Sequence, residues 1–237
     1  MKDLLHRFFA RKPALDSLQT ARLSAWHALP PPKQNSSFSG SRYVVLDVET
    51  TGLNLMTDTL ISIGAVAVVN GKIALSDSFS VILQQRTISD KENILVHGIS
   101  GTEQREGMSP ADGLLAFLEY LGKDPLVAFH VAFDETMIRR AMREYLGLSF
   151  KHPWLDLAYV MPAMYPELMY SHRSLDDWSS LFKIPNENRH NAAADALATA
   201  QLLLIAASRS RQDRDSSYDD LRSLERSYRS SVIHGKR

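Results

Sequence analysis

The segment from Tyr43 to Gly52, YVVLDVETTG, constrains the fold of this chain more than any other stretch. It ends an apolar, mostly β-branched run with Asp47 and Glu49, two residues apart, and such a run is typical of a buried strand. In an extended strand both carboxylates point to the same face. Two acids held together at the edge of a buried sheet repel each other and lose hydration, and a divalent cation is the usual compensation. We therefore expect half of a metal site here.

Two later segments supply further candidate ligands. The run LVAFHVAFD ends at Asp134 and is followed by apolar residues at helical spacing, which predicts a strand-to-helix junction at this acid. The run HNAAADALATA starts at His190 and contains Asp195, and its alanine- and leucine-rich composition predicts a helix from about residue 191. Both residues reach one site if His190 lies on the loop or first turn and Asp195 points inward.

Together these segments offer Asp47, Glu49, Asp134 and Asp195 as oxygen ligands and His190 as a base. Carboxylates without cysteine suit hard cations such as Mg²⁺ or Mn²⁺. Two such ions roughly 4 Å apart can clamp the attacking and leaving oxygens of an in-line phosphoryl displacement. A neutral histidine can take a proton from the attacking water at physiological pH. The chemistry indicated is phosphodiester hydrolysis.

The order of these motifs, DxE, then FD, then HxxxxD, resembles the DEDDh 3′–5′ exonucleases. The similarity is greatest to proofreading proteins related to the epsilon subunit of bacterial DNA polymerase III, and it covers roughly residues 41–208. It implies an α/β fold with an RNase H-like mixed sheet flanked by helices. It also implies two divalent cations and the release of nucleotides from the 3′ end of a single strand, with DNA favoured over RNA.

The resemblance further implies a role for each residue of the site. Asp47 would bridge both metals, and Glu49 would hold one of them and help to position the water. Asp195 would complete the shell of that metal, while Asp134 would help to hold the second. His190 would be the general base.

The chain departs from this family pattern at one place. Family members often have His-Asn five and four residues before the middle aspartate, where this chain has Phe129 and His130. The substrate or supporting role of that asparagine therefore does not carry over. Because Asp134 is present, we expect the metal site to be kept.

Five further residues are candidates for contact with the substrate. Thr50, Thr51 and Gly52 break the first strand into a turn that can admit a substrate close to the backbone. Leu53 follows this turn and, if the resemblance holds, wedges against the terminal base. His97 begins a His-Gly-Ile sequence that is similar to a short family loop near the 3′ nucleotide.

Length and composition indicate one domain with tails. We expect an N-terminal accessory segment and linker over 1–40, the exonuclease domain over 41–208 and a polar C-terminal tail over 209–237. The absence of cysteine among the 237 residues excludes disulfides and fits a reducing interior. No apolar run approaches the ~20 residues of a membrane span, so we expect no membrane contact and a cytoplasmic location. The formal net charge is zero, which predicts weak, salt-sensitive binding to nucleic acid.

Hydrophobic periodicity predicts a mixed sheet flanked by helices. We expect strands over 43–49, 60–69, 73–83 and 125–131, with a hairpin turn at Asn70-Gly71. Helices are predicted over 14–29, 110–121, 135–146, 154–164, 174–182 and from about 191. The C-terminal tail forms either a short amphipathic helix or no fixed structure.

Alternative interpretations stay open at this point. An exoribonuclease would use the same chemistry, and the sequence does not show whether the site accepts a 2′-hydroxyl. A nuclease-like binding module in a polymerase or repair complex is an interpretation from another class, and a polymerase or repair protein is a possible partner of an active enzyme. Taken singly, Asp134 is explained by helix capping and Asp195 by an ion pair with a nearby arginine such as Arg189.

Overall fold

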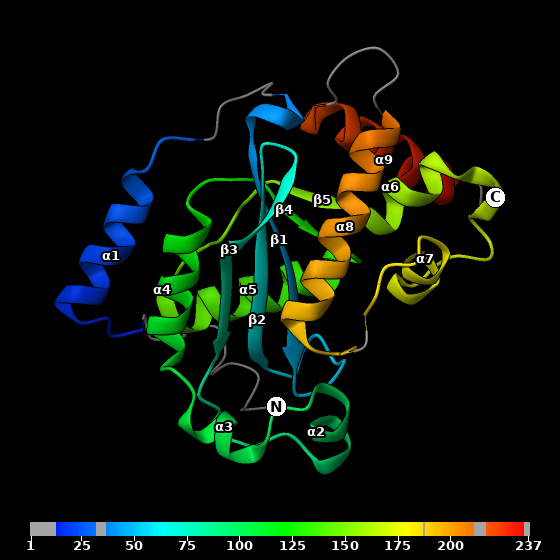
Figure 1. Cartoon of the computed structure of the whole chain (residues 1–237). Coiled ribbons are helices and arrows are strands. Elements are labelled where there is room, and N and C mark those ends of the chain that lie inside the picture. Colours follow the sequence, from blue (N-terminus) through cyan, green and yellow to red (C-terminus); the bar gives the residue numbers. More distant parts are fainter. Residues whose placement is uncertain (1–12, 32–36, 187, 211–216, 235–237) are drawn as a thin grey trace.

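The strands of the chain form a single mixed sheet. The computed structural model describes residues 13–31, 37–186, 188–210 and 217–234 (Figure 1). Within them, five strands lie in the order β3-β2-β1-β4-β5. Strands β1, β2 and β3 pair antiparallel, whereas β4 and β5 run parallel to β1. Their bounds are β1 Arg42–Thr50, β2 Leu60–Val69, β3 Lys72–Ile82, β4 Leu126–Ala128 and β5 Trp154–Asp156.

The hairpin between β2 and β3 has the turn that the sequence predicts. Asn70 and Gly71 have φ angles of 51° and 72°. Two successive residues with positive φ are characteristic of the type I′ turn, whose twist matches that of the flanking strands. This turn sets the register of the hairpin, in which Val69 pairs with Lys72.

Helices cover both faces of this sheet (Figure 1). Helix α8 crosses one face and contacts β1, β2 and β3, while α4 and α5 lie on the other. Helices α2 and α3 lie beyond the end of the sheet where β1 finishes (Figure 1). The helix bounds are α1 Ser17–Ala28, α2 Lys91–His97, α3 Gly101–Glu106, α4 Pro110–Leu121, α5 Val131–Leu146, α6 Leu157–Met164, α7 Leu175–Leu181, α8 Ala192–Ser210 and α9 Tyr218–His234.

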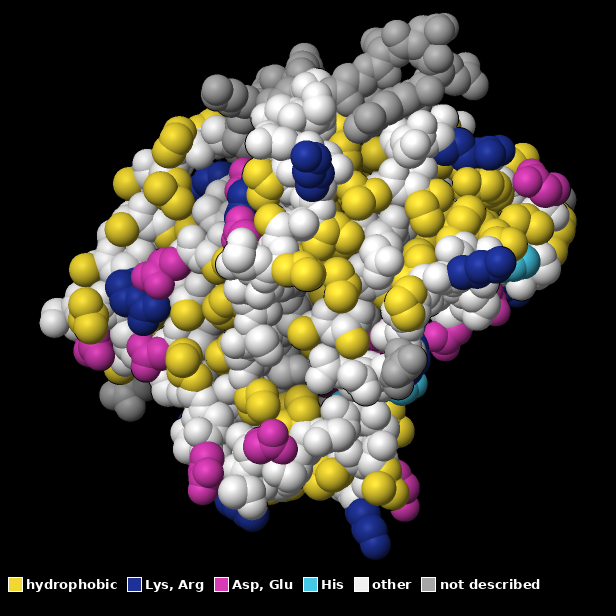
Figure 2. Space-filling model, viewed as in Figure 1, with side chains coloured by type: hydrophobic (Ala, Val, Ile, Leu, Met, Phe, Trp, Pro, Cys, Tyr) yellow, Lys and Arg dark blue, Asp and Glu magenta, His cyan; other side chains and the backbone are white. Residues whose placement is uncertain are grey.

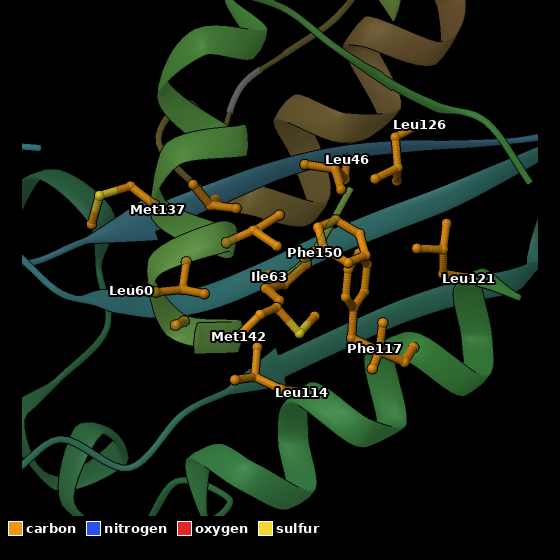
Figure 3. Close-up of a cluster of buried hydrophobic side chains, with 14 of the residues drawn as sticks. Leu46, Leu60, Ile63, Leu114, Phe117, Leu121, Leu126, Met137, Met142 and Phe150 are labelled. Atoms are coloured by element: carbon orange, nitrogen blue, oxygen red, sulfur yellow. The ribbon is translucent and has the colours of Figure 1, made fainter. Parts of the chain in front are cut away.

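Two cores hold the layers together, and β1 contributes to both. Leu46 and Val48 pack between the sheet and helices α4 and α5, in the core drawn in Figure 3. Val45 packs on the opposite face, in the core that includes α8. Asp47 and Glu49 continue the alternation of Val45 along the strand, so they face α8 rather than α5.

The sequence prediction was wrong in the middle of the chain. The predicted strand 125–131 is shorter, because β4 ends at Ala128 and α5 begins at Val131. His130 turns the chain sharply between them: it has a φ of 68° and its N–H donates to Asp156 Oδ1 at 3.0 Å. Asp134 therefore lies inside the first turn of α5 instead of ahead of the helix. The predicted helix 154–164 begins with the three residues of β5, and α2 and α3 were not predicted.

The segment before the sheet is attached to the domain by helix α1. Arg22 bridges Glu119 and Asp112 of α4, with N–O distances of 2.7 and 3.4 Å. Trp26 is buried, and its indole N–H donates to the Gly122 carbonyl at 2.7 Å. The predicted helix over 14–29 is thus confirmed. Of the predicted linker, residues 33–36 lie outside the described residues, while Phe38 is fully buried against the domain.

The C-terminal region contains a helix that packs on the domain. Helix α9 contacts α6, and its Leu221 is fully buried. Glu225 is also buried and pairs with Arg222 and Arg229 of the same helix. Of the two possibilities that the sequence left open for this tail, the amphipathic helix is the one present.

Candidate active site

Three carboxylates converge where β1 meets the start of α8. One oxygen from each of Asp47, Glu49 and Asp195 lies within 4.8 Å of the others. Asp47 and Glu49 come from the same face of β1, and Asp195 is buried in the first turn of α8. The structure therefore brings together three of the four predicted oxygen ligands.

A glycine in the neighbouring strand allows this convergence. Gly64 of β2 pairs directly with Asp47 in the antiparallel ladder. A Cβ atom at Gly64 would lie 2.3 Å from backbone atoms of Ala192 and Ala193, which begin α8. The absence of a side chain thus lets the helix rest on the sheet beside Asp47, and this places Asp195 near the β1 acids.

The fourth predicted ligand, Asp134, approaches from the other side of the sheet. It is buried in the first turn of α5 and is not one of the three clustered carboxylates. Burial raises the pKa of its carboxyl well above the ordinary value, and the negative charge of Asp47 raises this pKa further. A hydrogen bond from the Val48 backbone acts in the opposite direction. Asp134 is therefore close enough to Asp47 for the two charges to interact.

The site crowds carboxyl groups together: Asp195 is buried, and Asp47 and Glu49 are half-buried beside it. Burial, followed by the nearby charge of Asp195, raises the pKa of Asp47 to about 8. Burial, followed by the charges of Asp47 and Asp195, raises the pKa of Glu49 to about 9. The positive charge of Arg189 lowers both values but does not offset the other causes. A set of crowded, desolvated carboxylate oxygens fits a hard divalent cation, which would restore these groups to their charged form.

His190 lies in the turn directly before α8. It has a φ of 60° and is exposed, while its backbone N–H donates to Asp195 Oδ2 at 3.1 Å. With Glu49 and His97 it lines a groove with a volume of about 410 Å³. The predicted base thus lies beside the acid cluster, on the loop and not within the helix.

The turn after β1 is braced by its own side chains. Thr50 donates from its hydroxyl to the Gly52 carbonyl at 2.6 Å, and Thr51 donates to Asp58 Oδ1 at 3.1 Å. A Cβ atom at Gly52 would lie 2.6 Å from Asp58 Oδ2. The threonine hydroxyls therefore fix the shape of the turn. Leu53 projects from it with a relative exposure of 86%.

His97 is part of a buried polar network. Its Nδ1 accepts from the Ile99 N–H at 3.0 Å, and its Nε2 lies 3.3 Å from Ser89 Oγ. Burial lowers the pKa of this histidine. Because both ring nitrogens have partners within the protein, this geometry suits a residue that shapes the groove wall. Contact with substrate stays a prediction.

Sequence reasoning missed three residues that support the site. Asn186 donates from Nδ2 to Asp195 Oδ1 at 2.6 Å, and Asp156 holds the His130 N–H before α5. Gly64 gave no sequence signal beyond a glycine inside an apolar strand, which is a known mark of close backbone approach. By contrast, the ion pair of Arg189 with Asp195, considered above as a purely structural explanation, is present.

Comparison with known proteins places this arrangement in a family. The exonuclease family model RNase_T matches residues 44–203, the segment that contains all four acids and His190. The chain is 30% identical over 195 residues to a PolC-type DNA polymerase III of Clostridium perfringens and 32% identical over 163 residues to that of Bacillus subtilis. These matches cover 80% and 68% of this chain but only 13% and 11% of the polymerases.

Solved structures share the fold. Escherichia coli Exonuclease I in complex with a dT13 oligonucleotide matches with a TM-score of 0.61 and 19% identity, over 73% of this chain and 42% of that one. Exonuclease X in complex with 5′-overhanging duplex DNA matches with a TM-score of 0.56 and 20% identity, over 76% and 98%. The chain therefore belongs to the exonuclease family, and its sheet has the RNase H-like arrangement that the motifs predicted. In the part of the chain that the structure describes, no helix is long and apolar enough to span a membrane.

Proposed function

We propose that this protein is a metal-dependent 3′–5′ exonuclease that hydrolyses phosphodiester bonds at the 3′ end of single-stranded DNA. The observation that carries this proposal is the convergence of Asp47, Glu49 and Asp195 within 4.8 Å, beside an exposed His190. A crowded group of acids next to an exposed imidazole is a costly arrangement that a hydrolytic site explains.

In this proposal the acids bind the cations and His190 transfers the proton. Asp47, Glu49 and Asp195, with Asp134 behind Asp47, would hold two divalent cations, Mg²⁺ or Mn²⁺. When bound, such ions supply charge stabilisation for the attacking and leaving oxygens and lower the pKa of water. His190 accepts the proton of the attacking water from the rim of the groove, where its exposed ring can exchange that proton with solvent.

The substrate end is held in the groove between α2 and the loop before α8. Glu49, His97 and His190 line this groove. Leu53 is exposed on the turn after β1, and Asn93 of α2 donates to the Thr51 carbonyl of that turn. Lys and Arg are scattered among other side chains on the face shown in Figure 2, without a continuous basic stripe. The formal net charge of the chain is zero, so we expect weak, salt-sensitive binding that depends on the terminal nucleotides and the cations.

Single-stranded DNA is the substrate we favour because of the proteins that this chain resembles. Exonuclease I binds a dT13 oligonucleotide, and the PolC-type relatives are DNA polymerases. A polymerase or repair protein is the partner we expect for it, because the PolC-type relatives are DNA polymerases. A cytoplasmic location stays part of the same proposal.

End-labelled substrates test this function. Single-stranded DNA and RNA of the same sequence, each labelled at the 5′ or the 3′ end, are incubated with Mg²⁺, Mn²⁺ or EDTA. We expect 5′-labelled DNA to shorten in single-nucleotide steps with either metal, and 3′-labelled DNA to release a labelled mononucleotide at once. Faster cleavage of RNA would change the substrate to RNA, and metal-independent or internal cleavage would overturn the mechanism.

A further inference from the structure

Arg189 lies between two acids that belong to different helices. Its Nη1 forms an ion pair with Asp195 Oδ2, and its Nε forms one with Asp176 Oδ1 of α7. The Asp195 side chain is only 4% exposed, whereas that of Asp176 is 57% exposed. The guanidinium thus links the buried acid of the cluster to a carboxylate at the protein surface.

These contacts use most of the hydrogen-bonding capacity of Asp195. Among the described residues, Oδ2 accepts from Arg189 Nη1 and from the His190 N–H, and Oδ1 accepts from Asn186 Nδ2. A carboxylate has about four acceptor positions, two on each oxygen. Three of them are occupied, so one position on Oδ1 is left.

The partners of Asp195 also fix its orientation. Asn186, Arg189 and His190 all come from the short segment between α7 and α8, and Asp176 anchors Arg189 from the other side. Arg189 Nη1 donates a hydrogen bond to Asp195 Oδ2, while the contact of its Nε with Asp176 Oδ1 is an ion pair. The carboxylate therefore cannot turn about its own axis without breaking contacts on both oxygens.

We propose that Arg189 is a positioning residue, which bridges Asp176 and Asp195 so that Asp195 offers a single oxygen, Oδ1, to a divalent cation. This inference rests on the proposed function and deepens it. Hydrogen-bonded partners that orient metal ligands typically change metal affinity 10–100-fold when they are removed. The opposing effect is repulsion between the guanidinium and the cation, which solvent weakens because Arg189 is partly exposed. We therefore expect the orientation of Asp195 to change metal affinity more than this repulsion does.

Metal binding by the full-length chain tests the proposal without using nuclease activity. Titration calorimetry measures the Mn²⁺ dissociation constant of the wild type and of Arg189→Met. We expect Arg189→Met to weaken Mn²⁺ binding about 10–100-fold. Unchanged or tighter binding by the folded variant would overturn the proposal, since it would mean a purely structural contact or net repulsion.

Arg22→Met is the matched control. Arg22 also bridges two carboxylates, those of Asp112 and Glu119, and its side chain is 24% exposed against 27% for Arg189. It lies on α1, away from the acid cluster, so this variant should keep wild-type Mn²⁺ affinity. An equal loss in both variants would show a general effect of losing an arginine and would contradict the assigned role.

Two further variants make the result independent of the folding of Arg189→Met. Asp176→Asn removes only the outer anchor at an exposed position, and we expect it to weaken Mn²⁺ binding about 2–5-fold. No change in this variant would overturn the bridging role. In an Asp195→Asn background, Arg189→Met should cost less than about twofold more, because the two residues act as a unit. Wild-type protein that binds Mn²⁺ but cleaves no nucleic acid would contradict the proposed function and leave this inference standing.

Discussion

Gly64 lies opposite Asp47 in the β1–β2 ladder, and the backbone of Ala192 occupies the space that a side chain at Gly64 would need. This contact sets the distance between the strand that carries two acids and the helix that carries the third. The geometry of the acid cluster thus depends on a residue that has no functional group.

Gly64→Ala should therefore damage the site more than the fold. The added methyl group would meet backbone atoms at 2.3 Å, so α8 must move away from β2. We expect a loss of about 1–3 kcal/mol in the free energy of unfolding and at least a tenfold loss of kcat. Gly113→Ala is the control, because its methyl group would meet Leu83 in a core remote from the acids. Comparable losses of kcat in the two variants would contradict this account.

His190→Ala should lower the rate while the cations still bind. The imidazole is exposed, and only the backbone N–H of His190 contacts Asp195, so the substitution removes no metal-cluster contact. We expect a 10²–10⁴-fold fall in kcat with little change in the Mn²⁺ dissociation constant. Activity within threefold of wild type at neutral pH would exclude His190 as the general base.

Stability should depend on pH in a direction set by the raised carboxyl pKa values. The pKa of Asp47 is raised to about 8 and that of Glu49 to about 9, whereas both titrate near 4 in the unfolded chain. Between the unfolded and the folded pKa values, the folded protein binds more protons than the unfolded one. Its stability in EDTA should therefore fall as the pH rises from about 4 to about 9.

Thermal unfolding of the wild type and of Asp47→Asn, each in EDTA and in Mg²⁺, measures this effect. The wild type should lose stability more steeply with pH than Asp47→Asn does. Added Mg²⁺ should stabilise the wild type most at high pH, where the carboxyls give up their protons readily. Parallel curves for the two proteins would mean that Asp47 does not have a raised pKa.

Leu53→Ala tests whether the turn after β1 contacts the terminal nucleotide. Because Leu53 is 86% exposed, its removal should leave the free energy of unfolding within about 0.5 kcal/mol of wild type. We expect KM for single-stranded DNA to rise about fivefold, the effect of roughly 1 kcal/mol of lost apolar contact. An unchanged KM would remove Leu53 from the substrate-binding residues.

The long elements of the fold were predictable because their patterns are long. Strands β1 and β2 are extended apolar runs, and β3 follows β2 through an Asn-Gly turn. The acids of β1 share a face for reasons of strand geometry alone. Strands β4 and β5 have three residues each, too few to show a period. Because of the sharp turn at His130, α5 begins at Val131 and not at the predicted residue 135. Nothing in a single sequence marks a positive φ at a histidine.

Helices α2 and α3 were not predicted, although the sequence contains capping residues for both. Helix α3 begins with a capping box between Ser100 and Glu103, and Asp90 caps α2. The candidate site residues were named from motif order, yet their supporting contacts depend on tertiary packing. The close approach at Gly64 and the bridge through Arg189 both join segments more than ten residues apart.

The most direct test of the central claim compares wild-type protein with Asp47→Ala in the release of the 3′ nucleotide from single-stranded DNA. Both proteins are purified free of other nucleases and assayed in saturating Mg²⁺. Because Asp47 belongs to the acid cluster and its charge acts on both Glu49 and Asp134, we expect Asp47→Ala to lower the rate at least about 10³-fold, the effect of some 4 kcal/mol of lost transition-state stabilisation. Release at the wild-type rate by a folded Asp47→Ala protein would contradict the assignment of this site.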